Sequence, residues 1–273
     1  MTENSVSSAW GARIAAHSWQ KGAGLRTDPD QPGFFKVAAV KKLLWDEAGA
    51  RRVPRQAAFD TAVSRLRRGR LEELCELGPR GPIYLIPTPP FLRALEKRLR
   101  ALGHGPIVEV AAGDGHLTRA LRARGLRVTA TDSGAWERPE ARMSARERRE
   151  LRGTKVSGLR RGDDVLRLGA LPAIRELRPR IVLASWLPPG PLLGKLIKAP
   201  VRYVLEIGAG SGVTGDLSCW RYPHEFCDEL DAKARCRLDE RPARELHTRV
   251  TLYLGAAHPD FREDRAHWAL QKA

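Results

Sequence analysis

The segment Ile107–Asp132 constrains the fold of this chain more than any other part of the sequence. It reads IVEVAAGDGHLTRALRARGLRVTATD: a short apolar run, a glycine-containing turn, a helix-forming stretch and a second apolar run. Apolar runs joined by a helical stretch are typical of parallel strands that a right-handed crossover connects. The segment therefore predicts the first strand–helix–strand unit of an open parallel sheet.

The same alternation continues toward the end of the chain. Further apolar runs occupy residues 181–188, 201–208 and 249–257, and helical or loop segments separate them. Strands that alternate with helices indicate an α/β fold. We therefore expect a Rossmann-like, mostly parallel sheet with flanking helices over residues 105–273.

The part of the chain before this domain has a different character. Residues 1–33 are rich in Ser, Gly, Asp and Pro without periodicity, which predicts a loose N-terminal arm. Residues 34–104 predict a mainly helical region, with a strand or extended bridge at 81–87 and a boundary near 103–105. A winged-helix unit that binds DNA or forms a dimer is one interpretation of this region. A helical lid is the other, and we favour it.

The strongest functional signal lies where the first two strands end. Glu109 stands near the end of the first strand, Gly113 and Gly115 lie in the turn, and Asp132 ends the second strand. Glycine lets a backbone adopt positive φ and approach a ligand closely. Open parallel sheets bind ligands beyond the carboxyl ends of their strands, and an acid there can accept the hydroxyl groups of a ribose. These residues therefore predict a nucleoside site.

With these residues the chain resembles the class I S-adenosylmethionine-dependent methyltransferases, whose first motif is E/D-x-G-x-G-x-G. Alanine stands at the place of the first glycine. The resemblance implies a final antiparallel strand at 249–255, a ribose-binding Asp132, and Asp163 near the adenine amino group. The full cofactor set that we expect is Glu109, Ala111, Gly113, Gly115, Asp132, Ser133, Asp163, Asp164 and Ser185.

The segment after the fourth strand corresponds to the catalytic loop of this family. Ser185 and Trp186 begin SWLPPG, which contains the ingredients of the [DNS]-P-P-[YFW] motif of amino-methylating members in another order. We expect Trp186 to stack on a flat acceptor and Ser185 to orient it. Glu206 is the third catalytic candidate, as a base or an amine binder. A core tryptophan and a structural acid are the alternatives, and the methylated atom stays open.

Two other nucleotide sites compete with this interpretation. A nicotinamide or flavin dinucleotide site needs a third small residue, but counting from Ala111 that place holds His116. The segment VLEIGAGSGVTG at 204–215 also matches the acid-and-glycine motif, through Glu206 and the glycines of 208–212. Too few residues follow it for a complete cofactor domain, so we interpret 201–207 as the fifth strand. A rearranged domain with its cofactor at these glycines is the alternative.

The net charge of +16 makes nucleic acid a candidate partner. However, the excess is spread evenly on both sides of residue 104, and arginine greatly outnumbers lysine, as in proteins from GC-rich genomes. The densest basic run, 138–161, could grip a phosphate backbone or form a solvated helix face. The charge alone therefore does not identify a nucleic-acid-binding protein.

Composition argues against a disulfide framework, a metal site and a membrane span. The cysteines are Cys75, Cys219, Cys227 and Cys236. Their spacing matches no zinc knuckle even with His224, so we expect scattered buried cysteines and no metal. His224 and His247 are expected to be ordinary polar residues. No apolar run approaches the roughly 20 residues of a membrane span, and a cytoplasmic protein is expected.

The resemblance implies an enzyme, an S-adenosylmethionine-dependent methyltransferase that works by in-line displacement. A small-molecule acceptor, such as a secondary metabolite, is the first hypothesis. An RNA or protein methyltransferase that uses residues 138–161 is the second. A non-catalytic protein that binds S-adenosylmethionine or DNA is the third, because a fold does not fix a function. The helical region could also serve as a homodimer contact.

Overall fold

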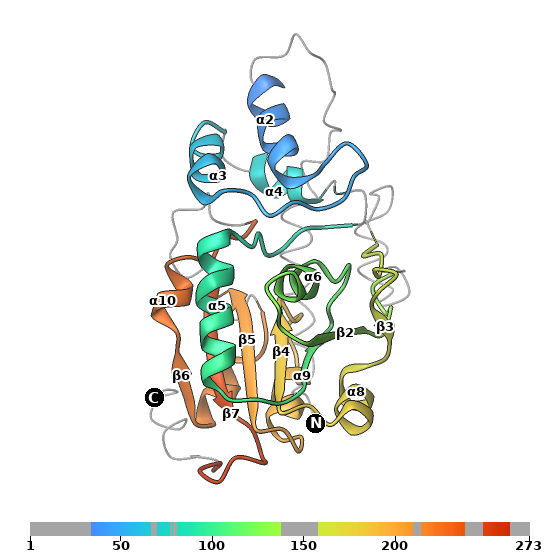
Figure 1. Ribbon diagram of the computed structural model, residues 1–273, viewed down its shortest axis with the longest axis vertical. Helices are drawn as coiled ribbons and strands as arrows, with labels where there is room; N and C mark the ends of the chain where they lie inside the picture. Colours follow the sequence, from blue (N-terminus) through green and yellow to red (C-terminus); the bar gives the residue numbers. More distant parts are fainter. Residues whose placement is uncertain are drawn as a thin grey trace, which may run out of the picture.

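The computed structural model describes residues 34–66, 70–76, 78, 81–137, 158–209, 214–237 and 248–262. Figure 1 shows a group of short helices at the top and a sheet flanked by helices below. Several features of the sequence lie outside the described residues: the expected arm 1–33, most of the basic run 138–161, His247, Gly210 and Gly212.

Within the described residues the larger part is a seven-stranded sheet with the order β3-β2-β1-β4-β5-β7-β6. The strands are β1 (Ile107–Val110), β2 (Val128–Asp132), β3 (Leu166–Arg167), β4 (Ile181–Ser185), β5 (Tyr203–Ala209), β6 (His224–Phe226) and β7 (Thr248–Leu254). Neighbouring strands are parallel, except that β7 runs antiparallel to both β5 and β6. The predicted α/β fold class is confirmed, and so is its final antiparallel strand.

The central strands supply side chains to two apolar cores, because successive residues of a strand point to opposite faces. In β1, Ile107 packs into one core, whereas Val108 and Val110 pack into the other. The first face is covered by α5 (Pro89–Ala101), α6 (His116–Arg122) and α10 (Asp228–Asp231). The second is covered by α8 (Ala170–Leu177), α9 (Leu192–Ile197) and the 3-10 helix η2 (Leu217–Arg221). In Figure 1, α5 and α6 lie in front of the sheet and α9 lies behind it.

Residues 34–86, which we call the N-terminal module, enclose a third core. The helices are α2 (Phe34–Leu44), α3 (Gln56–Val63) and α4 (Arg70–Glu76). They surround the buried side chains of Val40, Phe59 and Leu71, and Ile83 and Ile86 complete this core. The expected helical N-terminal region is thus confirmed.

The helix that Pro89 opens belongs to the sheet and not to the module. Leu95 and Leu99 on α5 are fully buried in the same core as Leu121 of α6 and Ile181 of β4. The packing therefore divides the chain near residue 88, earlier than the boundary expected at 103–105. The apolar stripe of α5 could be recognised in the sequence, but its packing partner could not.

An extended connecting segment, residues 81–87, joins the two parts. Leu85 forms an antiparallel bridge with Cys236. Nearby, Nε of Arg235 lies 2.8 Å from Oδ1 of Asp60 on α3. A winged-helix unit would use the connecting segment in its own hairpin, but here it pairs with the C-terminal half of the chain. That half therefore holds the N-terminal module in place.

The described residues also show the state of the cysteines, the possible metal ligands and the length of the helices. All four cysteines are buried thiols, as expected of scattered core cysteines. No group of described His, Cys, Asp or Glu residues could hold a metal ion. Among the residues described, no helix combines the length and the apolar character that a membrane crossing requires.

The assignment of α5 to the sheet core predicts a large effect of Leu95→Ala. Because Leu95 is fully buried, its truncation leaves a cavity beneath α5 and should lower the free energy of unfolding by about 2–5 kcal/mol. Arg93→Ala, at an exposed position of the same helix, should change it by less than about 0.5 kcal/mol. Urea unfolding followed by circular dichroism measures both values, and equal effects would contradict this packing.

Candidate functional site

A pocket of about 500 Å³ lies where β1, β2 and β4 end. The turn 111–114 follows β1, Ser133 follows β2, and residues 185–189 begin at the last residue of β4, and all of them line the pocket. The N-terminal module contributes Arg51 and the connecting segment to the opposite wall. This edge of the sheet is the place where the sequence predicted a ligand.

The turn after β1 has the backbone conformation of a glycine turn. Ala111 has a φ of 52°, Gly113 has 55° and Gly115 has 74°. Ala111 therefore adopts the left-handed conformation at the place where the family motif has glycine, at a cost of about 1 kcal/mol or more. A Cβ added at Gly113 would lie 2.8 Å from Cδ2 of Leu159. The turn is thus tight, and it is strained at Ala111.

Asp132 ties the end of β2 to this turn. The backbone N–H of Gly113 donates to Oδ2 of Asp132 at 2.9 Å, and that of Gly134 donates to Oδ1 at 2.7 Å. The side chain is buried, but it lines the pocket. Its position is therefore fixed by two backbone donors, and its remaining lone pairs can accept hydrogen bonds from a ligand.

Glu109 lies deeper, below the turn. Oγ1 of Thr118 on α6 donates to its Oε2 at 2.5 Å. Burial raises the pKa of Glu109 to about 7, against the opposing effect of the Thr118 hydrogen bond. Near neutral pH this carboxyl group is therefore partly protonated, and it braces α6 against β1.

Arg51 of the N-terminal module meets Asp114 of the turn after β1. Nη1 of Arg51 lies 3.4 Å from Oδ1 of Asp114, and Nη2 donates to the carbonyl of Leu85 at 2.7 Å. The same Asp114 oxygen accepts the backbone N–H of His116 at 3.1 Å. Arg51 supplies the one Lys or Arg side chain among the described residues that line the pocket.

The far end of the pocket, beyond β4, is aromatic. The ring of Trp186 stacks on Tyr84 of the connecting segment, with centroids 5.6 Å apart and planes at 28°. Trp186 has a φ of 54°, and its backbone N–H donates to the carbonyl of Ile207 at 2.7 Å. Its buried Nε1 has no hydrogen-bond partner. Strained residues of this kind occur preferentially at functional sites, where the surrounding structure holds them.

An apolar rim lies beside Asp132. The side chain of Trp136 is 46% exposed and lines the pocket together with Leu159. The backbone N–H of Leu159 donates to the carbonyl of Trp136 at 2.9 Å, which fixes the two segments side by side. A large, exposed aromatic ring at a pocket rim is suited to cover a flat ligand.

Most of the expected site residues meet in this pocket. They are Glu109, Ala111, Gly113, Asp132, Ser133, Ser185 and Trp186. Gly115 lies behind the turn, at the N-cap of α6. Asp163 and Asp164 are exposed and do not line the pocket, and Asp164 pairs with Arg119 and Arg122. The family resemblance implied a cofactor contact here, but the turn before β3 leaves both side chains exposed and outside the pocket lining.

Glu206 is also separated from the pocket. Its neighbours in β5, Val204 and Leu205, pack into the second and the first core, so Glu206 points toward the second face by strand alternation. There it lines a small cavity beside η2 with Asp216 and Tyr253. Burial raises the pKa of Glu206 to about 7, and the charge of Asp216 acts in the same direction. The fifth strand, which the sequence predicted at 201–207, runs from Tyr203 to Ala209.

Sequence reasoning missed much of the pocket lining, and three of the missed residues show why. Arg51 and Tyr84 come from the N-terminal module, far from the motif in sequence. His116 had entered the sequence argument as a poor substitute for glycine, but it lines the pocket as a buried side chain. The sequence shows only that Arg51 lies between two predicted helices, and this does not reveal that its side chain lines the pocket.

No family model and no curated protein matches the sequence. Among solved structures, the 23S rRNA methyltransferase ErmE is similar with a TM-score of 0.34 and 16% identity over 64% of this chain and 71% of its own. A SAM-dependent methyltransferase from Agrobacterium tumefaciens has a TM-score of 0.29 and 13% identity over 60% of each chain. A putative RNA methyltransferase from Pyrococcus horikoshii has a TM-score of 0.32 and 12% identity over 81% of this chain and 97% of its own.

The strand order describes the fold independently of these similarities. Strands β3-β2-β1-β4-β5 follow the order of doubly wound sheets, and the reversed β7 lies between β5 and β6. This is the arrangement expected for the class I methyltransferase fold that the sequence resembles.

The strain at Ala111 predicts that Ala111→Gly stabilises the protein. Glycine adopts positive φ without a steric cost, so the free energy of unfolding should rise by about 1 kcal/mol. Gly113→Ala is the matched opposite change and should lower the free energy of unfolding. The new Cβ would clash with Leu159, and alanine would be strained at this positive φ. Urea titrations measure both. A stability loss in Ala111→Gly would contradict the strain.

The buried carboxyl group of Glu206 predicts a pH dependence of stability. Its pKa is raised, so between pH 4.5 and about 7 the folded protein keeps a proton that the unfolded chain has released. The free energy of unfolding therefore falls as the pH rises through this window. Glu206→Gln, which cannot ionise, should gain up to about 3 kcal/mol over wild type across the window and nothing further above it. A difference that is constant from pH 4.5 to 8 would refute this.

Proposed function

We propose that the pocket binds S-adenosylmethionine and that the protein transfers its methyl group to a small, flat acceptor. The observation that carries the proposal is Asp132, held by two backbone N–H groups at the end of β2, beside a positive-φ turn in a pocket. When bound, the cofactor supplies an activated methyl group on a positively charged sulfur. The protein then has to align donor and acceptor.

The residues around Asp132 fit an adenosine. The free lone pairs of its carboxylate suit the ribose hydroxyl groups, and Ser133 offers a further hydroxyl beside them. Trp136 and Leu159 form an apolar rim for the flat base. The absence of a side chain at Gly113 lets backbone and ligand approach closely. The expected contacts of Asp163 and Asp164 are not part of this proposal.

The charges of the pocket favour a cationic cofactor over a dinucleotide. The pocket lining holds the carboxylates of Asp114 and Asp132 and a single guanidinium group, that of Arg51, and Glu109 adds negative charge above about pH 7. S-adenosylmethionine carries a sulfonium, an ammonium and a carboxylate, so it is net positive. A pyrophosphate would bring two negative charges into a pocket that already holds an excess of carboxylates. This balance argues against a nicotinamide or flavin dinucleotide.

The aromatic end supports a small, flat acceptor. Trp186 and Tyr84 present stacked rings, and Pro189 and Leu192 add apolar surface. Ser185 can orient the acceptor from the end of β4. The connecting segment closes this end from above, which suits a small molecule. An RNA or protein acceptor rests on residues 138–161, of which 138–157 lie outside the described part, and we do not propose it.

In this proposal Ser185 and Trp186 position the acceptor and Glu206 takes no part. Glu206 lies on the other face of the sheet, and Glu109 is occupied by Thr118. Among the described pocket residues, catalysis therefore depends on orientation and on the exclusion of water by the N-terminal module.

Titration calorimetry with S-adenosylhomocysteine, the demethylated cofactor, tests the proposal. We expect micromolar binding by the wild type and roughly 100-fold weaker binding by Asp132→Ala, because two charge-assisted hydrogen bonds to the ribose are lost. Asp164→Ala removes an exposed carboxylate outside the pocket and should bind like the wild type. A thermal melt of each variant checks that it is folded. Absence of binding by folded wild-type protein would overturn the proposal.

A further inference from the structure

We propose that the small cavity between β5 and η2 binds a monovalent cation of the size of sodium, potassium or ammonium, with the carboxylate of Glu206 as its principal ligand. The cavity has a volume of about 20 Å³ and is lined by residues of β5, η2 and β7. It lies on the second face of the sheet, where the proposed methyl transfer takes no part. The inference therefore concerns a second site and does not depend on the proposed function.

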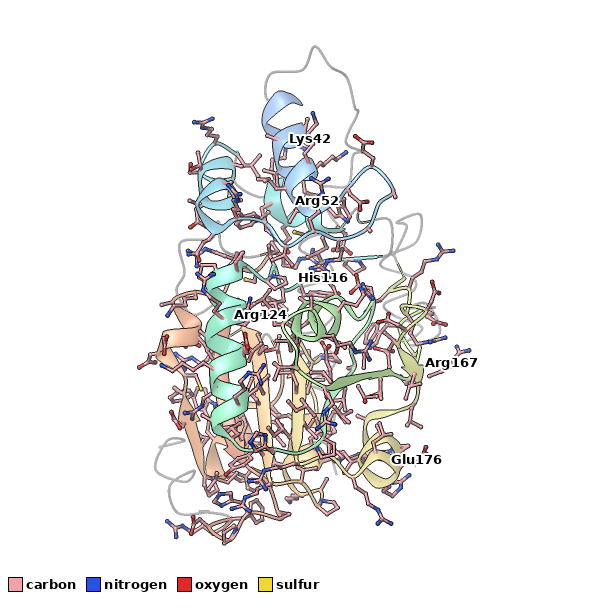
Figure 2. All side chains as sticks on the ribbon, viewed as in Figure 1. Lys42, Arg52, His116, Arg124, Arg167 and Glu176 are labelled. Atoms are coloured by element: carbon pink, nitrogen blue, oxygen red, sulfur yellow. The ribbon has the colours of Figure 1, made fainter. Side chains whose placement is uncertain are left out.

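Glu206 is a buried carboxyl group that has no partner among the described residues. Charged side chains such as Arg167 and Glu176 lie exposed at the periphery of the molecule (Figure 2), whereas only 8% of Glu206 is exposed. No hydrogen bond from a described residue acts on its carboxyl group. Its two oxygen atoms are not enclosed, as the unpartnered Nε1 of Trp186 is, so they contribute to the cavity surface. Burying an unpaired carboxylate costs free energy, so the cavity favours a ligand that neutralises it.

Two glycines leave the space beside this carboxyl group. A Cβ added at Gly215 would clash with Oε1 of Glu206, and one added at Gly208 would lie 3.3 Å from the same atom. Any larger residue at these positions would thus fill the volume next to Oε1. A cavity of about 20 Å³ accommodates one ligand of the size of a water molecule, and the three cations are of about this size or smaller.

The other atoms of the lining are suited to a hard cation. Asp216 lies at the N-cap of η2, where its Oδ1 accepts the Ser218 N–H at 2.9 Å, and its charge raises the pKa of Glu206. Thr214 and Thr251 add hydroxyl oxygens to the lining. Hard cations prefer such oxygen ligands. A water molecule could donate to both carboxylates, but it would leave their negative charge uncompensated.

The other ionisable groups around Glu206 do not neutralise it. Tyr253 of β7 and Cys219 of η2 are buried, and burial raises the pKa of each, so both stay uncharged near neutral pH. Arg249 also lines the cavity, but its guanidinium group lies over the ring of Phe226, 4.7 Å from the centroid. No described cation lowers the pKa of Glu206.

The charge and the space together favour a monovalent ion. Among the residues that the structure describes, no group of three His, Cys, Asp or Glu side chains could hold a metal ion. Magnesium retains several water ligands and calcium takes about six to eight oxygens, so neither fits a cavity of one water's size. The bound ion would also hold the segment between the two sites, because Thr214 lines both of them and the Gly215 N–H donates to the carbonyl of Leu187 at 3.1 Å.

The cation competes with a proton for Glu206. Burial raises the pKa of this carboxyl group to about 7, so it is mostly protonated at pH 6 and mostly ionised at pH 8. The ion therefore binds mainly above pH 7, and its binding releases a proton.

Thermal melts of the full chain in chloride salts of equal concentration test the site. Sodium, potassium and ammonium are compared with tetramethylammonium, which is too large for the cavity. At pH 8 and about 200 mM salt, at least one of the small cations should raise the midpoint of unfolding by about 3–5 °C. At pH 6 the difference should fall below about 1 °C, because Glu206 keeps its proton.

Two variants separate the site from a general salt effect. Glu206→Gln keeps the shape of the side chain without its charge and should melt at the same temperature in all four salts. Asp164→Asn removes an exposed carboxylate outside the cavity and should keep the wild-type differences. Equal wild-type midpoints in all four salts at pH 8, or differences that persist in Glu206→Gln, would mean that the cavity holds water only and would overturn the inference. The pH dependence of the wild type tests the same point without a substitution.

Discussion

The hydrogen bond from the Gly113 N–H to the Asp132 carboxylate is the constraint on which the pocket depends. It joins the turn after β1 to the end of β2, so the two strands end at one level and α6 begins directly beside them. The bond requires a backbone that turns through positive φ at Ala111 and Gly113. The strain at Ala111 is compatible with folding because buried strands on either side fix the ends of the turn. Local strain and site geometry thus have one cause.

Strand alternation decides which of two similar glycine-rich segments can form the site. Glu109 and Glu206 both stand near the end of a central strand, both are buried, and burial raises the pKa of each to about 7. However, Glu109 faces α6 and the pocket, whereas Glu206 faces η2 on the other side of the sheet. A shift of one residue along the strand would move each side chain to the other face of the sheet. A motif match therefore identifies a site only when the face on which its acidic residue lies is also known.

The features that could be predicted are those that depend on residues close to one another in the sequence. The apolar runs and the glycine turn gave the strands, the fold class and the places of Gly113 and Asp132, because each depends on a few residues in sequence. Arg51 could not be found this way, since its contact with Asp114 spans 63 residues of sequence. The cofactor contact that the resemblance implies for Asp164 stays a prediction, because a place in the sequence does not fix the direction of a side chain, and in the structure two arginines of α6 pair with this carboxylate outside the pocket.

The wall opposite the sheet is built by contacts between distant parts of the chain, and this determines how it can act. Tyr84 lies between the ring of Trp186 and the guanidinium group of Arg237, which stands 5.1 Å from its centroid. Arg237 is in turn paired with Glu76 of α4. The module is therefore fastened through buried charge and aromatic contacts to the C-terminal half, which opposes a freely swinging lid. A wall fixed in this way selects an acceptor by its shape, and it holds Arg51 in place before any ligand binds.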